Sequence, residues 1–203
     1  MPAREWVNSI SHAVGAGLSV AGLVFLIGAA QRHGGWALAS ALVYGISLVL
    51  LFTFSTLFHS LQGRARQVLQ RFDHIGIHLL IAGTYTPYCI LVLRDGWGWP
   101  ILGIVWGLAF VGIVLESIFG PRYVLPTTLL YLAEGWVILL DLRGLFLSLP
   151  LAGFAWLLVG GLLYTLGTYF FLRERIPYNH EIWHFFVLGA ASCHFVSVFC
   201  YVL

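Results

Sequence analysis

Asn179-His180-Glu181-Ile182-Trp183-His184 begins the last long apolar segment of the chain, which continues to residue 203. His180 and His184 are four residues apart, so on a helix they lie on the same face. This is the spacing by which one helix presents two imidazoles to one metal ion. The stretch therefore predicts an apolar helix that carries two candidate metal ligands at its start.

The composition places this helix in a membrane. Hydrophobic residues make up 60% of the 203 residues and charged residues only 9%, whereas soluble domains carry about 25% charged residues. The net charge of +2 is too small to indicate nucleic acid as a partner. The apolar runs are too long for barrel strands and do not alternate. The sequence thus predicts an all-α integral membrane protein.

Seven apolar segments are separated by short breaks that are polar or contain Gly and Pro. Each is near the roughly 20 residues that cross a bilayer. The close spacing leaves no room for a separate soluble domain, so residues 1–203 are predicted to form a single seven-helix transmembrane domain. The predicted helices lie at about 9–30, 36–60, 73–93, 98–119, 123–142, 151–172 and 180–203.

The arginines set the expected orientation of this bundle. When the breaks are assigned alternately to the two sides, one side receives seven arginines and the other three. Short loops rich in arginine stay in the cytoplasm. The N-terminus is therefore predicted to be cytoplasmic and the C-terminus outside, in the cell inner (plasma) membrane. The larger set comprises Arg4, Arg64, Arg66, Arg71, Arg122, Arg173 and Arg175.

Candidate site residues from three predicted helices fall at one depth, near the cytoplasmic side. His59 ends the second segment, Asp73 opens the third, and His180 and His184 open the seventh. Ser55 lies one turn before His59 on the same face. Ionisable residues are costly in hydrocarbon and usually face a bundle interior or a cavity. These side chains are therefore predicted to meet at one site.

Three imidazoles bind Zn²⁺ well and leave a fourth position for a water molecule. Zinc lowers the pKa of that water to about 7, which makes it a nucleophile near neutral pH. Asp73 is the candidate to orient the water and take its proton, and its spacing also allows it to be the fourth ligand. The alternative is that the histidines are solvated by lipid headgroups, while Asp73 complements a helix dipole and Ser55 bonds its own helix.

Other polar residues of the predicted helices have weaker interpretations. His74 and His78 are expected to pack near the site, and His194 to lie too deep for the same metal. Glu116 is expected to reach the interface or pair with Arg122. Glu5, Asn8 and His12 share one face at the cytoplasmic end of the first segment, where His12 is a candidate partner for Glu5 or for a metal-bound group. Glu134, near the middle of the fifth segment, is expected to be neutral or paired.

The motifs Glu5-x-x-Asn8-x-x-x-His12, Ser55-x-x-x-His59, Asp73 and His180-x-x-x-His184 occur in an order that resembles the progestin and adipoQ receptor family, and most closely its short bacterial haemolysin III-type members. The resemblance implies a seven-helix bundle with the N-terminus inside, and zinc held by the three histidines. It also implies that Asp73 contacts a zinc-bound water, with Ser55 beside the site. Adiponectin receptors are linked to ceramide hydrolysis, so the resemblance implies a metal-dependent amide hydrolase. The long N-terminal region of the animal receptors is missing, and a receptor role is not carried over.

The leading hypothesis is a membrane-embedded zinc protein that hydrolyses a lipid amide or ester at the cytoplasmic side, with Asp73 and Ser55 as catalytic candidates. Membrane lipids are the expected partners. The alternative is a non-catalytic, zinc-stabilised protein that regulates membrane homeostasis or signalling. A haem protein is disfavoured because the spacing of His180 and His194 has no match on another helix. A transporter is disfavoured because the polar residues become sparse toward the outer side.

Overall fold

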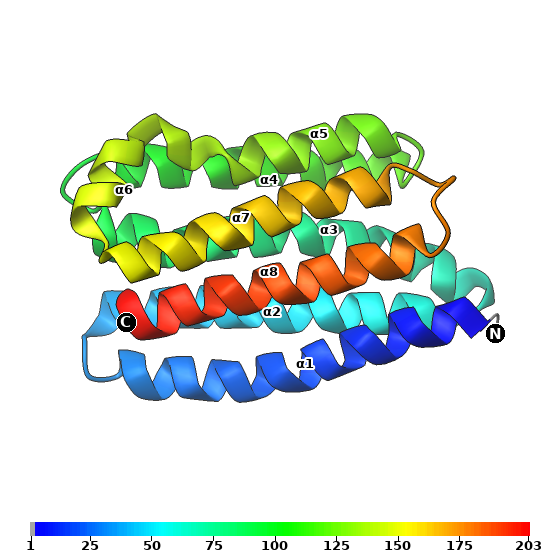
Figure 1. The fold of residues 1–203 in the computed structure, drawn as a ribbon, viewed down its shortest axis with the longest axis horizontal. Coiled ribbons are helices and arrows are strands. Elements are labelled where there is room, and N and C mark those ends of the chain that lie inside the picture. The colour runs from blue at the N-terminus through cyan, green and yellow to red at the C-terminus, as the bar shows by residue number, and fades with distance from the viewer. Residues whose placement is uncertain (1–2) are drawn as a thin grey trace.

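The structure is a computed structural model that describes residues 3–203, with side chains from residue 5 onward. The side chain of Arg4, which the orientation prediction uses, lies outside the described residues. Every element in the described part is helical (Figure 1). The α-helices are α1 (Ala3–Ala30), α2 (Gly35–Ser60), α3 (Gly63–Pro87), α4 (Gly98–Phe119), α5 (Val124–Gly135), α6 (Leu142–Ser148), α7 (Leu151–Phe171) and α8 (Asn179–Tyr201).

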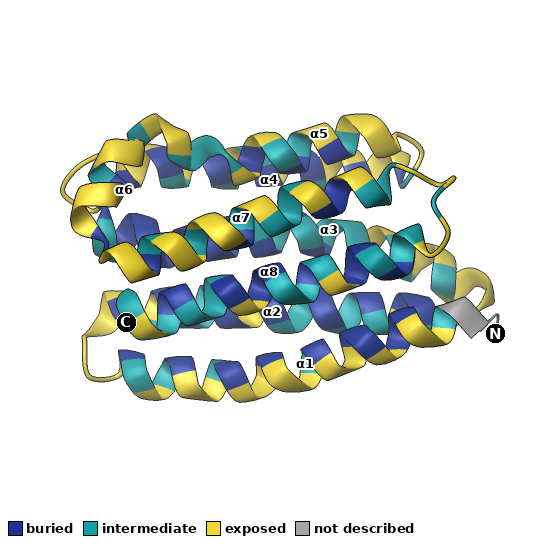
Figure 2. Cartoon of the chain, viewed as in Figure 1, coloured by how far each residue is buried: buried dark blue, intermediate teal, exposed yellow. Residues whose placement is uncertain are grey.

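Six stretches are long and apolar enough to cross a membrane, so the chain is a multi-pass membrane protein. They comprise α1 from Glu5 onward, α2, α3 with its extension to Val92, α4, α7 and α8. Large apolar side chains such as Phe110, Leu147 and Leu166 are exposed on the outside of the bundle, and the outer faces of α1 and α7 are largely exposed in Figure 2. A surface of this kind suits lipid better than water.

The long helices lie side by side along one axis (Figure 1). Helix α2 packs between α1 and α3, while α8 packs against α7 and α1. The N-terminal end of α1 and the first turn of α8 lie at the same end of the bundle, and the C-terminus lies at the opposite end. This arrangement brings the last turn of α2 and the first turn of α8 together, although about 120 residues separate them along the chain.

Helix α3 begins at Gly63, ten residues before the predicted start at residue 73. The turns between Gly63 and Asp73 are rich in arginine and glutamine, so hydropathy alone cannot detect them. At its other end α3 passes through Pro87 into a π-helical turn, Tyr88–Val92. The apolar pattern located the membrane part of this helix but not its first turns.

The segment predicted as one helix over residues 123–142 is broken. Helix α5 ends at Gly135, and a 3-10 turn, Val137–Asp141, leads into α6. Tyr85 of α3 fills the break, because its hydroxyl donates to the Gly135 carbonyl at 2.7 Å and accepts the Ile138 N–H at 2.9 Å. Backbone groups freed at membrane depth need protein partners, and here one side chain supplies both.

The variant Tyr85→Phe is expected to lower the free energy of unfolding by about 2 kcal/mol, because it leaves a carbonyl and an N–H without partners. For a chain of this length such a loss lowers the midpoint of thermal unfolding by about 5 °C. Thermal denaturation in detergent measures the effect, with Tyr123→Phe at an exposed tyrosine as the control. Equal midpoints for the two variants would show that Tyr85 does not stabilise the break.

Candidate metal centre

Three histidines meet at the end of the bundle where α2 ends and α8 begins. One ligand atom from each of His59, His180 and His184 lies within 4.8 Å of the other two, so the group could hold a metal ion. His59 Nε2 and His180 Nε2 are 3.3 Å apart. Two nitrogens bound tetrahedrally to zinc at 2.0–2.1 Å are about 3.3–3.4 Å apart. The pair thus already has the separation that a shared ion requires.

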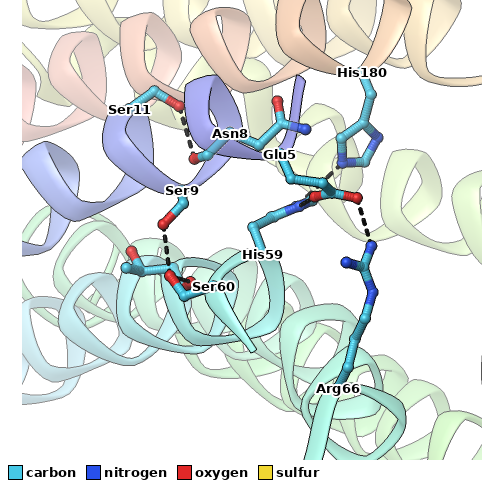
Figure 3. A network of polar contacts seen from close by, with 9 residues as sticks. Glu5, Asn8, Ser9, Ser11, His59, Ser60, Arg66 and His180 are labelled. Atoms are coloured by element: carbon cyan, nitrogen blue, oxygen red, sulfur yellow. Dashed lines mark hydrogen bonds and ion pairs between the residues drawn. The ribbon is translucent and has the colours of Figure 1, made fainter. Parts of the chain in front are cut away.

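Glu5 of α1 fixes the orientation of the His59 ring (Figure 3). Glu5 Oε2 lies 2.6 Å from His59 Nδ1, and Arg66 of α3 donates to Glu5 Oε1 at 2.6 Å. A carboxylate can only accept, so Nδ1 carries the proton and donates it. In a neutral imidazole this leaves Nε2 with a free lone pair, directed toward His180. Carboxylates commonly orient metal-binding histidines in this way.

His184 is held by a second histidine. The ring of His12 stacks on the ring of His184, with centroids 3.7 Å apart and 26° between the planes. Both rings are buried, and His184 Nδ1 and both nitrogens of His12 have no hydrogen-bond partner among the described residues. Buried nitrogens without partners are rare in folded proteins. Their presence beside the three histidines fits a site that is completed by a ligand.

Ser55 and Asp73 lie beside the three histidines, as the sequence predicts. Ser55 is buried one turn before His59, and Asp73 is half-buried and lines the same cavity as the histidines. The Asp73 carboxylate lies near the Ser55 hydroxyl and near His59. Asp73 does not belong to the group of mutually close ligand atoms. Its position suits a contact with a small molecule held at the histidines.

The cavity has a volume of about 700 Å³ and runs from this site into the bundle. Its volume is within the range of about 300–1,000 Å³ that is typical of small-molecule sites. The three histidines, Ser55 and Asp73 line one end. Most of the remaining wall is apolar and includes Leu51, Ile81, Leu132, Trp136, Leu157 and Val187. The site is therefore polar at one end and suited to hydrocarbon along most of its length.

Two further polar pairs lie between α3, α4 and α5. Glu116 is buried, and its Oε1 lies 3.2 Å from His74 Nδ1. Both expectations for Glu116, that it reaches the interface or pairs with Arg122, are therefore wrong. Glu134 Oε1 lies 2.6 Å from His78 Nδ1, and both side chains are fully buried. Helical spacing could not reveal these pairs, because each joins residues more than forty positions apart. The pairs fasten α4 and α5 to α3 behind the metal-site end of the cavity.

The fold and the site together define a multi-pass, all-helical membrane protein with a buried three-histidine group that could hold a metal ion. Residues 2–195 match the model of the family described as Haemolysin-III related, and the chain belongs to this family. This confirms the resemblance to haemolysin III-type members of the progestin and adipoQ receptor family.

The chain is similar to relatives along nearly its whole length. It is 44% identical to Hemolysin-3 of Bacillus cereus over 98% of this chain and 92% of that protein. It is 42% identical to the Hemolysin-3 homolog of Bacillus subtilis (strain 168) over 98% of this chain and 94% of that protein. A more distant similarity, 29% over 82% of this chain and 72% of the relative, connects it to the human monocyte to macrophage differentiation factor.

Proposed function

We propose that the protein is a membrane-embedded, zinc-dependent hydrolase that cleaves a lipid amide or ester at the cytoplasmic side of the membrane. The observation that carries the proposal is the position of the three histidines and Asp73 at the end of a largely apolar cavity of about 700 Å³. Three imidazoles suit Zn²⁺ and leave a coordination position open. The apolar wall suits a lipid chain, which membrane lipids would supply.

The proposed topology has seven crossings, with the N-terminus in the cytoplasm and the C-terminus outside, in the inner (plasma) membrane. Two observations support it. The broken segment from α5 to α6 runs along the bundle between the end of α4 and the start of α7, and the two termini lie at opposite ends (Figure 1). Most of the arginines lie at the histidine end, in the first turns of α3 and in the loops after α4 and α7, as expected for the cytoplasmic side.

Each residue of the site has a role in the proposed reaction. His59, His180 and His184 would hold the ion, and Glu5 with Arg66 would keep His59 Nε2 directed toward it. When bound, zinc would polarise the substrate carbonyl and acidify a water molecule. Asp73 would accept the proton of that water and return it to the leaving amine or alcohol. Ser55 would hold the Asp73 carboxylate in place.

The test begins with protein purified in detergent without chelators. Elemental analysis is expected to find about one zinc per chain, and incubation with lipid amides and esters is expected to release a fatty acid that mass spectrometry detects. Removing the metal with a chelator is expected to abolish release, and adding zinc is expected to restore it. Bound zinc that raises thermal stability without any released product would favour the non-catalytic alternative.

Glu5→Gln is expected to weaken zinc binding about tenfold, because an amide holds the His59 Nδ1–H less strongly than a carboxylate does. Competition with a chromogenic chelator measures the affinity. Glu174→Gln removes an exposed carboxylate at the same end of the bundle and is the matched control. An unchanged affinity in Glu5→Gln would show that the hydrogen bond to His59 does not support the metal.

A further inference from the structure

A second polar cluster lies deep in the bundle, far from the three histidines. It consists of Tyr44 of α2, Tyr88 of the π-helical turn, Tyr164 of α7 and His194 of α8. The last three line the cavity. The ring centroids of Tyr164 and His194 are 5.5 Å apart, and Tyr44 lies near Tyr88 and Tyr164. Four elements therefore converge on one polar region deep in the bundle.

The cluster is separate from the candidate metal centre. His194 follows His180 by fourteen residues in one helix, a rise of about 21 Å. Gly160 of α7 makes room for the His194 ring, since a Cβ at that position would overlap the imidazole. None of the four residues belongs to the three-histidine group. The roles proposed for zinc and Asp73 leave this cluster unexplained.

The hydrogen-bonding capacity of the cluster is not used up by the protein. Tyr44 is 0% and Tyr88 2% exposed, yet neither hydroxyl has a hydrogen-bond partner among the described residues. The Ser197 hydroxyl lies near Tyr88, but its hydrogen is donated to the Gly153 carbonyl at 2.8 Å and so is not available to the Tyr88 oxygen. A buried hydroxyl without a partner costs about 1–3 kcal/mol. Native structures usually satisfy such groups with a ligand or ordered water.

His194 gives the cluster an acceptor as well as donors. His194 Nε2 lies 3.1 Å from the Leu157 carbonyl, which can only accept. Nε2 therefore carries the proton and donates, and Nδ1 of the neutral ring is left as an acceptor. Tyrosine hydroxyls can donate to a ligand oxygen, while His194 Nδ1 can accept from it. An alcohol satisfies both, whereas a carbonyl satisfies only the donors and a charged group is too costly to bury here.

We propose that this cluster binds a hydroxyl group on the chain of a lipid whose hydrocarbon fills the cavity. Tyr88 donates to the lipid hydroxyl and His194 Nδ1 accepts its proton in a hydrogen bond, while the apolar wall holds the chain between the cluster and the metal centre. The protein thus selects a lipid by a polar group far from its headgroup. This binding requires neither zinc nor hydrolysis.

The test uses the full chain in detergent and a series of long-chain fatty amides. One amide is unsubstituted, and the others carry a single hydroxyl at successive positions along the chain. Binding is measured by the rise in the midpoint of thermal unfolding and by the change in tryptophan fluorescence, to which Trp136 and Trp183 contribute from the cavity wall. One hydroxyl position is expected to bind about tenfold more tightly than the unsubstituted amide, the effect of one to two net hydrogen bonds. Equal affinity across the series would mean that water alone occupies the cluster, and would overturn the proposal.

Variants locate the effect in the cluster. Tyr88→Phe is expected to remove the preference for the hydroxylated amide without lowering the stability of the ligand-free protein, because it deletes a hydroxyl that has no partner among the described residues. If Tyr88→Phe does not fold, Tyr164→Phe replaces it as the test variant of the cluster. Tyr131→Phe removes a hydroxyl that lines the same cavity near the metal end, where it donates to the His74 carbonyl, and it is expected to keep the preference. If both cluster variants keep it as well, the hydroxyl binds elsewhere and the proposal is wrong.

A chelator separates this proposal from the proposed hydrolase function. The preference for the hydroxylated amide is expected to persist in metal-free protein and in the His180→Ala/His184→Ala double variant. A protein that binds no zinc, or that hydrolyses no lipid, would therefore still bind the hydroxylated amide more tightly than the unsubstituted one. A protein that hydrolyses lipids without discriminating between the two amides would retain the hydrolase function and lose this inference.

Discussion

The His180→Ala/His184→Ala double variant is expected to lose its zinc completely, while the parent protein binds about one zinc per chain. The variant removes two of the three imidazoles and leaves only His59 at the end of α2. One imidazole cannot compete with water for the ion, because structural and catalytic zinc sites in proteins use three or four ligands. Elemental analysis after dialysis against micromolar zinc measures the difference.

The matched control for this variant is His33→Ala, which removes an exposed histidine from the loop between α1 and α2. It is expected to keep about one zinc per chain. Circular dichroism and gel filtration of both proteins show whether the helices are intact. If the double variant retained the zinc of the parent, the three histidines would not be the metal site. If the parent held none, the hydrolase proposal would fall.

The second large effect is expected from Asp73→Asn, which should retain zinc and lose lipid hydrolysis by a factor of about 10²–10⁴. Asparagine has nearly the same shape as aspartate, and it can still contact Ser55. It cannot accept the proton of a water molecule, and so the water stays a poor nucleophile. Measurements of turnover and zinc content on the same preparation test both parts of the prediction.

Two further variants test whether the loss of hydrolysis is specific to the Asp73 carboxylate. Ser55→Ala, which frees the Asp73 carboxylate from one contact, is expected to lower turnover by a smaller factor of about ten. Asp95→Asn changes an exposed carboxylate between α3 and α4 and should have no effect. Loss of zinc together with activity in Asp73→Asn would make Asp73 the fourth ligand. Full activity in that variant would exclude it as the base.

The grouping of the histidines could be predicted because membrane helices are nearly straight and parallel. In such a bundle, a residue's position along its segment fixes its depth, so the sequence alone assigns His59, His180 and His184 to one level. The structure confirms that they meet. The same rule placed Asp73 and Ser55 beside them, although their catalytic roles remain predictions.

Features that depend on long-range partners could not be predicted from depth. The break after Gly135 interrupts an apolar run that looks continuous, and a tyrosine fifty residues earlier stabilises it. Glu116 pairs with His74 across two helices. Glu5 was visible as an acidic residue at the right end of the first segment, but its contact with His59 depends on how α1 packs against α2. The residue pattern along one helix predicts the depth of each side chain and the helix face on which it lies. The contacts above also depend on how one helix is rotated relative to its neighbour.

The way in which Tyr85 holds the break has a consequence for how this protein can change. Tyr85 binds only main-chain atoms of Gly135 and Ile138, so it places no demand on the side chains that follow. Trp136, Ile138, Leu139 and Leu142 all line the cavity. These positions can therefore be varied in a combinatorial library to reshape the chamber, while the bend that presents them stays in place.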